Sequence, residues 1–169
     1  MNNNKVLKLV VGAMLAALVY VSTSIIKIPS PTGGYTNLGD CFVLISGWIL
    51  GPWWGGLASG IGSALTDLLS GYTHYVPGTF IIKGLDALVA AIVFKQMKKG
   101  IPAMVVSGII GEIIMVLGYF GYASLILGKG LAAAASIPGN IIQGVIGIVA
   151  GTIIMKLIQK SGARFLFND

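Results

Sequence analysis

Charged residues are scarce in this chain of 169 residues. Only 9% are Asp, Glu, Lys or Arg, whereas about 25% are charged in a typical soluble domain. Hydrophobic residues make up 56% of the chain, and the mean hydropathy is +0.91. Too little polar surface is left to cover a globule in water, and disorder requires low hydrophobicity together with high net charge. We therefore expect an integral membrane protein.

Cysteine and histidine are nearly absent, since the chain has only Cys41 and His74. One cysteine cannot form an internal disulfide, and zinc, haem or iron–sulfur sites need several such ligands at set spacing. The sequence also lacks the G-x-x-x-x-G-K-[ST], G-x-S-x-G and H-E-x-x-H motifs,. We therefore expect no enzymatic activity, no metal and no cofactor, and a partner must supply any ATP hydrolysis.

Apolar runs separated by polar, glycine or proline residues divide the chain into six segments. A helix needs about 20 residues to cross roughly 30 Å of hydrocarbon. We expect a single membrane domain over residues 1–169, with helices at 8–26, 38–50, 53–69, 77–94, 101–127 and 133–158. The segment 27–37, KIPSPTGGYTN, holds two prolines and two glycines. It predicts a shaped turn outside the membrane, not a helix.

Basic residues predict the orientation, because cytoplasmic loops carry an excess of Lys and Arg. With six crossings and a cytoplasmic N-terminus, eight of the eleven basic residues lie inside: Lys5, Lys8, Lys95, Lys98, Lys99, Lys156, Lys160 and Arg164. Lys27 and Lys129 then lie outside, and Lys83 lies within the fourth segment. The sequence therefore predicts an all-α membrane protein with six transmembrane helices and both termini inside.

Charged residues lie within the apolar segments, where an unpaired charge costs about 2.5–3.5 kcal/mol. Lys83 and Asp86 are three residues apart on one predicted helix and could pair with each other,. Glu112 has no cation near it in the sequence, so local pairing does not explain it. Asp40 and Asp67 lie near predicted outer helix ends, where they could cap a helix, pair with a loop lysine or face water.

Polar side chains gather at the predicted outer ends of the last three segments. Asn140 and Gln143 share one helix face, and so do Tyr119 and Tyr122. A binding pocket needs apolar walls and a few well-placed polar groups. The candidate substrate-binding residues are Tyr35, Asn37, Lys83, Asp86, Glu112, Tyr119, Tyr122, Asn140 and Gln143. Two other interpretations stay open: the tyrosines anchor the chain at the membrane surface, and the carboxamides only link helices.

Small residues lie close together in the first segment, at Gly12, Ala13, Ala16 and Ala17. Small residues four apart let helices approach closely in a membrane. Such a stripe serves either packing inside the protein or docking of a helix from a partner.

Three motifs resemble a known family. The stretches TGGYTNLGD, LGPWWGGLASGIGSALTD and PGTFIIKG are similar to those of S components, the substrate-binding subunits of energy-coupling factor (ECF) vitamin transporters. The resemblance covers most of the chain and is strongest for the riboflavin-transporter-like group, in particular for hydroxymethylpyrimidine or pyridoxine types. It implies the S-component fold in a prokaryotic cell membrane and high-affinity capture of a small water-soluble vitamin or precursor.

The resemblance also implies partners and a mechanism. S components work with a transmembrane coupling protein and two cytoplasmic ATPases, and they carry the solute inward by toppling in the bilayer. By analogy, Ala13 and Ala17 match the family's A-x-x-x-A contact with the coupling protein, 27–37 matches its lid, and Asn140 matches an asparagine of its site. Two alternatives remain: a solitary proton-coupled carrier that uses Glu112, and a membrane interaction protein without transport activity.

Overall fold

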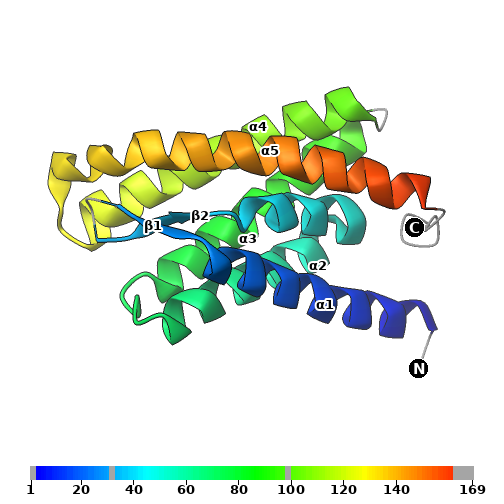
Figure 1. Ribbon diagram of the computed structural model, residues 1–169, viewed down its shortest axis with the longest axis horizontal. Helices are drawn as coiled ribbons and strands as arrows, with labels where there is room; N and C mark the ends of the chain where they lie inside the picture. Colours follow the sequence, from blue (N-terminus) through cyan, green and yellow to red (C-terminus); the bar gives the residue numbers. More distant parts are fainter. Residues whose placement is uncertain (1–2, 31–32, 98–99, 162–169) are drawn as a thin grey trace.

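The computed structural model describes residues 3–30, 33–97 and 100–161, and it is almost entirely helical (Figure 1). Five long helices and a small antiparallel hairpin follow one another: α1 (Asn3–Ile25), β1 (Lys27–Pro29), β2 (Tyr35–Asn37), α2 (Asp40–Leu69), α3 (Val76–Gln96), α4 (Ile101–Gly121) and α5 (Ile137–Lys160). Five stretches are long and apolar enough to cross a membrane. The predicted all-α membrane fold is confirmed.

The second helix reverses direction at Gly51. This residue has φ 78°, a left-handed conformation that glycine adopts without strain,. The Ser59 hydroxyl donates to the carbonyl oxygen of Val43 at 3.3 Å, although a straight helix would hold these residues about 24 Å apart. The two halves of α2 therefore lie antiparallel, and this one element contains the predicted segments 38–50 and 53–69.

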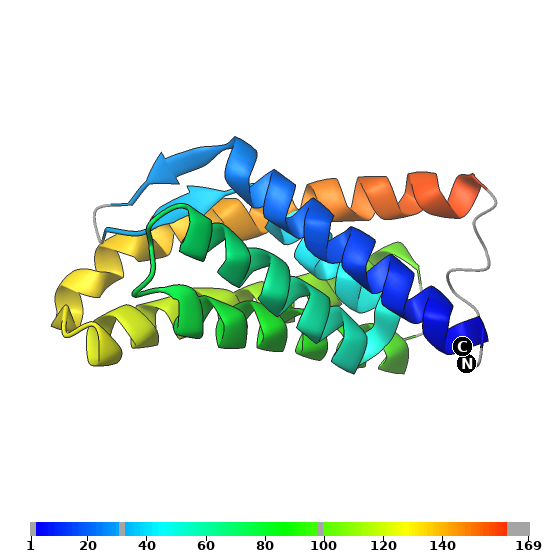
Figure 2. The same ribbon diagram turned by 90° about the horizontal axis from the view of Figure 1, so that it is seen from below.

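The helices lie side by side along the long axis of the molecule (Figures 1 and 2). The start of α1, the end of α3, the start of α4 and the end of α5 lie at one end, while the hairpin lies toward the other. Gly51 lies at the same end as the start of α1, because a Cβ placed on it would lie 3.2 Å from the ammonium of Lys95, near the end of α3. Of the predicted inner basic residues, Lys98, Lys99 and Arg164 lie outside the described residues.

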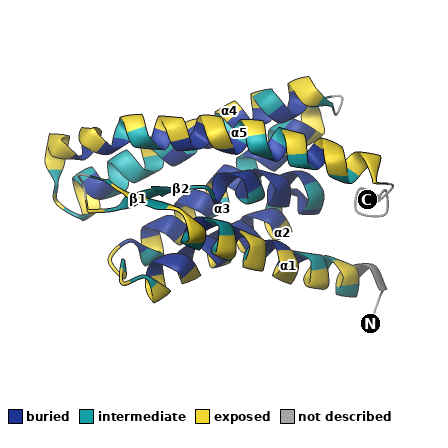
Figure 3. Cartoon of the chain, viewed as in Figure 1, coloured by how far each residue is buried: buried dark blue, intermediate teal, exposed yellow. Residues whose placement is uncertain are grey.

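The long helices carry exposed residues on the outside of the bundle and buried residues toward its interior (Figure 3). Many of the exposed residues are large and apolar, and several buried ones are polar. Every long helix exposes Leu, Ile or Val, including Leu9, Leu57, Ile81, Ile113 and Val149. The interior, by contrast, holds charged and hydroxyl side chains beside an apolar cluster around Leu44, Trp48 and Met104. Lipid chains solvate an apolar exterior, so this arrangement suits a bilayer.

Glycines let the helices approach closely, as small residues do in membrane proteins. A Cβ placed on Gly60 would lie 2.7 Å from the Phe80 carbonyl oxygen of α3. One placed on Gly62 would lie 2.5 Å from the Ala16 carbonyl oxygen of α1. The second half of α2 therefore packs closely against both α1 and α3.

The outer ends differ from the predicted helix bounds. The fourth helix ends at Gly121 and continues as a π turn, η1 (Tyr122–Ile126), while a 3₁₀ helix, η2 (Gly130–Ser136), precedes α5. Pro138 explains the start of α5, because proline is favoured in the first helical turn, where its missing N–H costs nothing,. The predicted outer turn is the β1–β2 hairpin.

Candidate functional site

A polar cavity lies between the hairpin and the ends of all five long helices. Its volume is about 40 Å³, and about 10–15 Å³ suffices for one water molecule. The lining residues are Thr23, Ser30, Gly34, Tyr35, Asn37, Ser63, Asp67, Tyr75, Thr79, Lys83, Tyr119, Ser136, Asn140 and Gln143. Carboxamides, hydroxyls, one ammonium and tyrosine rings thus converge on one small space.

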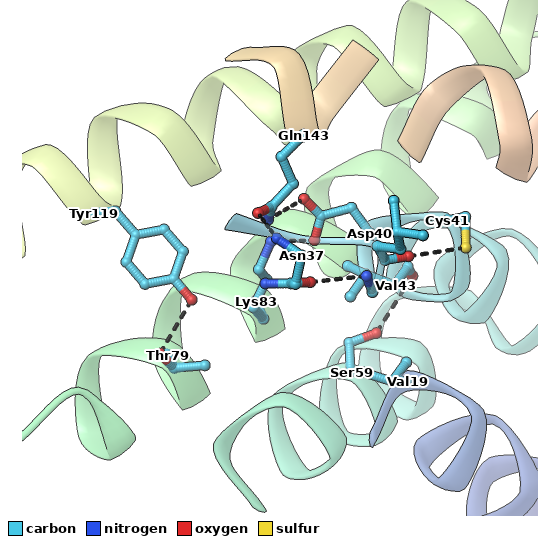
Figure 4. Close-up of polar contacts among 12 residues, drawn as sticks. Val19, Asn37, Asp40, Cys41, Val43, Ser59, Thr79, Lys83, Tyr119 and Gln143 are labelled. Atoms are coloured by element: carbon cyan, nitrogen blue, oxygen red, sulfur yellow. Dashed lines mark hydrogen bonds and ion pairs between the residues drawn. The ribbon is translucent and has the colours of Figure 1, made fainter. Parts of the chain in front are cut away.

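Lys83, which lines this cavity, forms an ion pair with Asp40 behind the lining (Figure 4). The Lys83 ammonium of α3 contacts the Asp40 carboxylate at the start of α2, and both residues are buried. The Gln143 amide of α5 donates to the other Asp40 oxygen at 2.7 Å, and its carbonyl oxygen accepts from the Asn37 backbone N–H at 2.7 Å. Three helices and the hairpin therefore meet at Asp40.

Tyrosines form the outer wall of the cavity. The Tyr35 hydroxyl of β2 donates to the Asp67 carboxylate at 2.5 Å, which ties the hairpin to the second half of α2. Burial, together with the negative charge of Asp67, raises the pKa of Tyr35 above its ordinary value, so the phenol stays a donor. On the opposite side, the Tyr119 hydroxyl bonds to that of Thr79 at 3.0 Å.

Comparison with known proteins identifies this architecture. The sequence matches the family described as ECF-type riboflavin transporter, S component, over residues 3–160. The chain belongs to this S-component family. Over 97% of its length it also superposes on 99% of a solved bacterial ECF transporter S component, with a TM-score of 0.65 and 25% identity.

Two relatives extend the comparison. The chain is 34% identical to an uncharacterized protein of Pyrococcus woesei over 143 residues, which are 84% of this chain and 95% of the relative. It is 26% identical to the thiamine precursor transporter HmpT of Lactococcus lactis subsp. cremoris over 165 residues, which are 96% of this chain and 93% of HmpT. The family consists of transporter subunits, not enzymes, and the chain is a vitamin-uptake subunit of this type in a membrane.

Six of the nine candidate substrate-binding residues of this S component line the cavity: Tyr35, Asn37, Lys83, Tyr119, Asn140 and Gln143. Tyr122 lies outside that lining, where its hydroxyl donates to the His74 carbonyl oxygen at 2.8 Å. Asp86 and Glu112 also lie outside the lining and pack behind Asp40. The sequence therefore predicts the location of the cavity but overstates which polar residues reach it.

Lys83 does not form the ion pair with Asp86 that their spacing would allow. Lys83 pairs instead with Asp40, which is 43 residues away in the sequence. Both oxygens of Asp86 are buried without a hydrogen-bond partner among the described residues. Lys83 and Asp86 are three residues apart and share one face of α3. The Lys83 ammonium nevertheless contacts the carboxylate of Asp40, which lies at the start of the first half of α2.

The small residues of α1 separate onto two faces. Gly12 is buried and Ala16 is half-buried; Ala16 lies against Gly62 of α2. Ala13 and Ala17, in contrast, face outward with exposed Met14 and Leu18 beside them. Internal packing thus accounts for the first pair, and the second pair remains open to another helix.

Proposed function

We propose that this S component binds a small, flat, nitrogen-containing vitamin or precursor of the hydroxymethylpyrimidine or pyridoxine class. The convergence of two carboxamides, Asn140 and Gln143, with the Lys83 ammonium on one tyrosine-walled cavity is the observation that carries the proposal. Carboxamides both donate and accept, so they match the mixed ring-nitrogen and amino edge of such a solute. The similarity to HmpT, a thiamine precursor transporter, supports the same class.

We also propose that this cavity is the closed state of the site, which its small volume supports. About 40 Å³ is far below the roughly 300–1,000 Å³ of typical ligand sites,. We infer that the hairpin acts as a lid and that a ligand enters when the bond between Tyr35 and Asp67 opens. Asn37 and Gln143 then hold the ligand from the lid and from α5, while Tyr122 braces the wall and Asp86 and Glu112 act from behind Asp40.

We further propose six crossings, with both termini on the cytoplasmic side of a prokaryotic plasma membrane. The lysines at the Gly51 end of the molecule favour this orientation, since basic residues accumulate inside. A coupling protein and two ATPases drive uptake, and the loaded subunit topples in the bilayer. Ala13 and Ala17 form the docking stripe, because they face outward and let a partner helix approach closely,.

Calorimetry on the purified protein in detergent tests the binding proposal. We expect saturable binding of hydroxymethylpyrimidine or pyridoxine without ATP, and weaker or no binding of riboflavin. Asn140→Ala should weaken binding at least tenfold, because it removes a carboxamide from the cavity. Ile141→Ala is the matched control, because Ile141 is the next residue along α5 and its side chain is 51% exposed on the outside of the protein. The absence of binding for every water-soluble vitamin, or an equal loss in both variants, would contradict the proposal.

Reconstitution tests the mechanism. With the coupling protein and ATPases in proteoliposomes, we expect uptake that requires ATP. The double variant Ala13→Leu/Ala17→Leu should abolish both uptake and co-purification of the module, but should still bind the vitamin. Val149→Leu adds bulk to an exposed face of α5 and should change neither. ATP-independent uptake driven by a proton gradient would instead favour a solitary carrier, and binding without any transport would favour an interaction protein.

A further inference from the structure

Three carboxylates converge behind the floor of the cavity. Asp40 of α2, Asp86 of α3 and Glu112 of α4 each offer one oxygen, and these oxygens lie within 4.8 Å of one another. Their relative exposures are 1%, 0% and 5%, so water does not screen the charges. Such a group carries strong mutual repulsion if all three residues are ionised.

The hydrogen bonds divide these carboxylates into two kinds. Asp40 receives the Lys83 ammonium on one oxygen and the Gln143 amide on the other. By contrast, all four oxygens of Asp86 and Glu112 are buried without a hydrogen-bond partner among the described residues. Three carboxylates against one ammonium leave an excess of two negative charges, and each buried unpaired charge costs several kcal/mol. The two excess negative charges thus equal in number the two carboxyl side chains without a hydrogen-bond partner, Asp86 and Glu112.

Bare glycine backbones surround the two unpartnered carboxyls. A Cβ placed on Gly144 of α5 would lie 2.9 Å from a Glu112 carboxyl oxygen, and one on Gly147 would lie 3.2 Å from the other. Gly111 of α4 makes the same kind of close approach to Asp86. The helices therefore pack closely against these groups, and neither carboxyl lines the polar cavity. Glu112 also borders an apolar groove of about 300 Å³ between α4 and α5. An occupant of the space between the converging oxygens must be very small.

We propose that Asp86 and Glu112 form a proton-binding site behind the vitamin cavity, where each holds one proton at neutral pH. Two protons cancel the excess charge and supply O–H donors to converging oxygens that otherwise have none. The charged and titratable groups facing the site are Lys83 of α3, Asp40 and Cys41 of α2, and Tyr119 of α4, while α5 presents Gln143 and glycine backbone.

The site is linked to the lid through named contacts. If Asp86 and Glu112 lose their protons, their charges compete with Asp40 for the Lys83 ammonium. Asp40 also holds Gln143, whose carbonyl oxygen holds the Asn37 backbone at the end of β2. Deprotonation therefore loosens the attachment of the hairpin, so the proton load sets how firmly the cavity is closed.

Infrared spectroscopy of the purified protein without vitamin tests the site, and it does not depend on the proposed substrate. At pH 7 we expect a protonated-carboxyl C=O band that corresponds to about two groups per chain and shifts in D₂O. Asp86→Asn and Glu112→Gln should each remove about half of the band, and the double variant should remove it. Asp67→Asn is the control and should leave the band unchanged, because that carboxylate already accepts a bond from Tyr35.

Three results would overturn the proposal. One is a wild-type spectrum without the band, which needs no variant to fold. Another is loss of the band in Asp67→Asn but not in the Asp86 and Glu112 variants. The third is disappearance of the wild-type band at constant pH on addition of NaCl, CaCl₂ or MgCl₂, which would assign the site to a metal cation. Failure of vitamin binding, in contrast, leaves the band unaffected and bears only on the proposed function.

Discussion

The two partners of the buried ion pair should differ in their importance to stability. In Lys83→Gln, Asp40 loses its ammonium, and three carboxyls then face one another without a cation. Removing one member of a buried pair costs about 3–5 kcal/mol, and 1 kcal/mol shifts Tm by about 2–4 °C in a chain of this size. We therefore expect Lys83→Gln to lower Tm by about 6–20 °C.

Asp40→Asn should cost much less. The Lys83 ammonium interacts electrostatically with Glu112 and Asp86 as well as with Asp40, so in this variant either carboxyl can release its proton and pair with Lys83. The remaining loss is one charge-assisted hydrogen bond, about 1.5–3 kcal/mol. The double variant Asp40→Asn/Lys83→Gln should be more stable than Lys83→Gln alone, because it leaves fewer unpaired charges.

Thermal unfolding in detergent, followed by tryptophan fluorescence, measures these differences. Lys156→Gln replaces an exposed lysine near the end of α5 and serves as the control, with an expected change within about 0.5 kcal/mol. A loss in Asp40→Asn equal to or larger than that in Lys83→Gln would refute the reasoning, since Asp86 and Glu112 would then offer no alternative partner to Lys83.

Two further predictions concern packing and the hairpin. Gly62→Ala should destabilise the protein by about 1–3 kcal/mol, since its Cβ would lie 2.5 Å from the Ala16 carbonyl oxygen; Gly84→Ala, with 3.4 Å to the Gly56 carbonyl oxygen, should be tolerated in the same unfolding assay. Tyr35→Phe removes the 2.5 Å bond to Asp67 and should speed hydrogen exchange in β1 and β2 about tenfold or more,. Tyr122→Phe, which loses a bond outside the hairpin, should leave those strands unchanged.

Much of the fold follows from the sequence, because the bilayer requires long apolar helices and the positions of Gly, Pro and Lys mark their ends. The reversal at Gly51 falls between the predicted segments 38–50 and 53–69, and the predicted shaped turn at 27–37 is the hairpin. The π turn and the 3₁₀ helix near the hairpin end of the molecule are not among the predicted elements. They depend on how α4 meets α5, which no local pattern encodes.

The site was predicted less completely, because its central contact is long-range. Asp40 was expected to cap a helix, pair with a loop lysine or face water, although it holds together Lys83 and Gln143. Spacing along one helix favoured Asp86 as the partner of Lys83, and only the packing of α2 against α3 decides otherwise. The sequence does contain a signal for this pair. A lysine within a membrane segment needs a carboxylate from some helix, and Asp40 lies in the pair of consecutive segments richest in glycine, which can pack most closely against a neighbour,.

The reversal of α2 at Gly51 also fixes how deep the cavity reaches. The first half of this helix has only 11 residues, from Asp40 to Leu50, and is therefore about 16 Å long. That is roughly half the thickness of the hydrocarbon layer. In the proposed orientation, with Gly51 at the cytoplasmic surface, Asp40 behind the cavity lies near the midplane, and this half-helix separates it from the cytoplasm. If the protein works as proposed, a bound solute rests about halfway across the bilayer before the coupling protein acts.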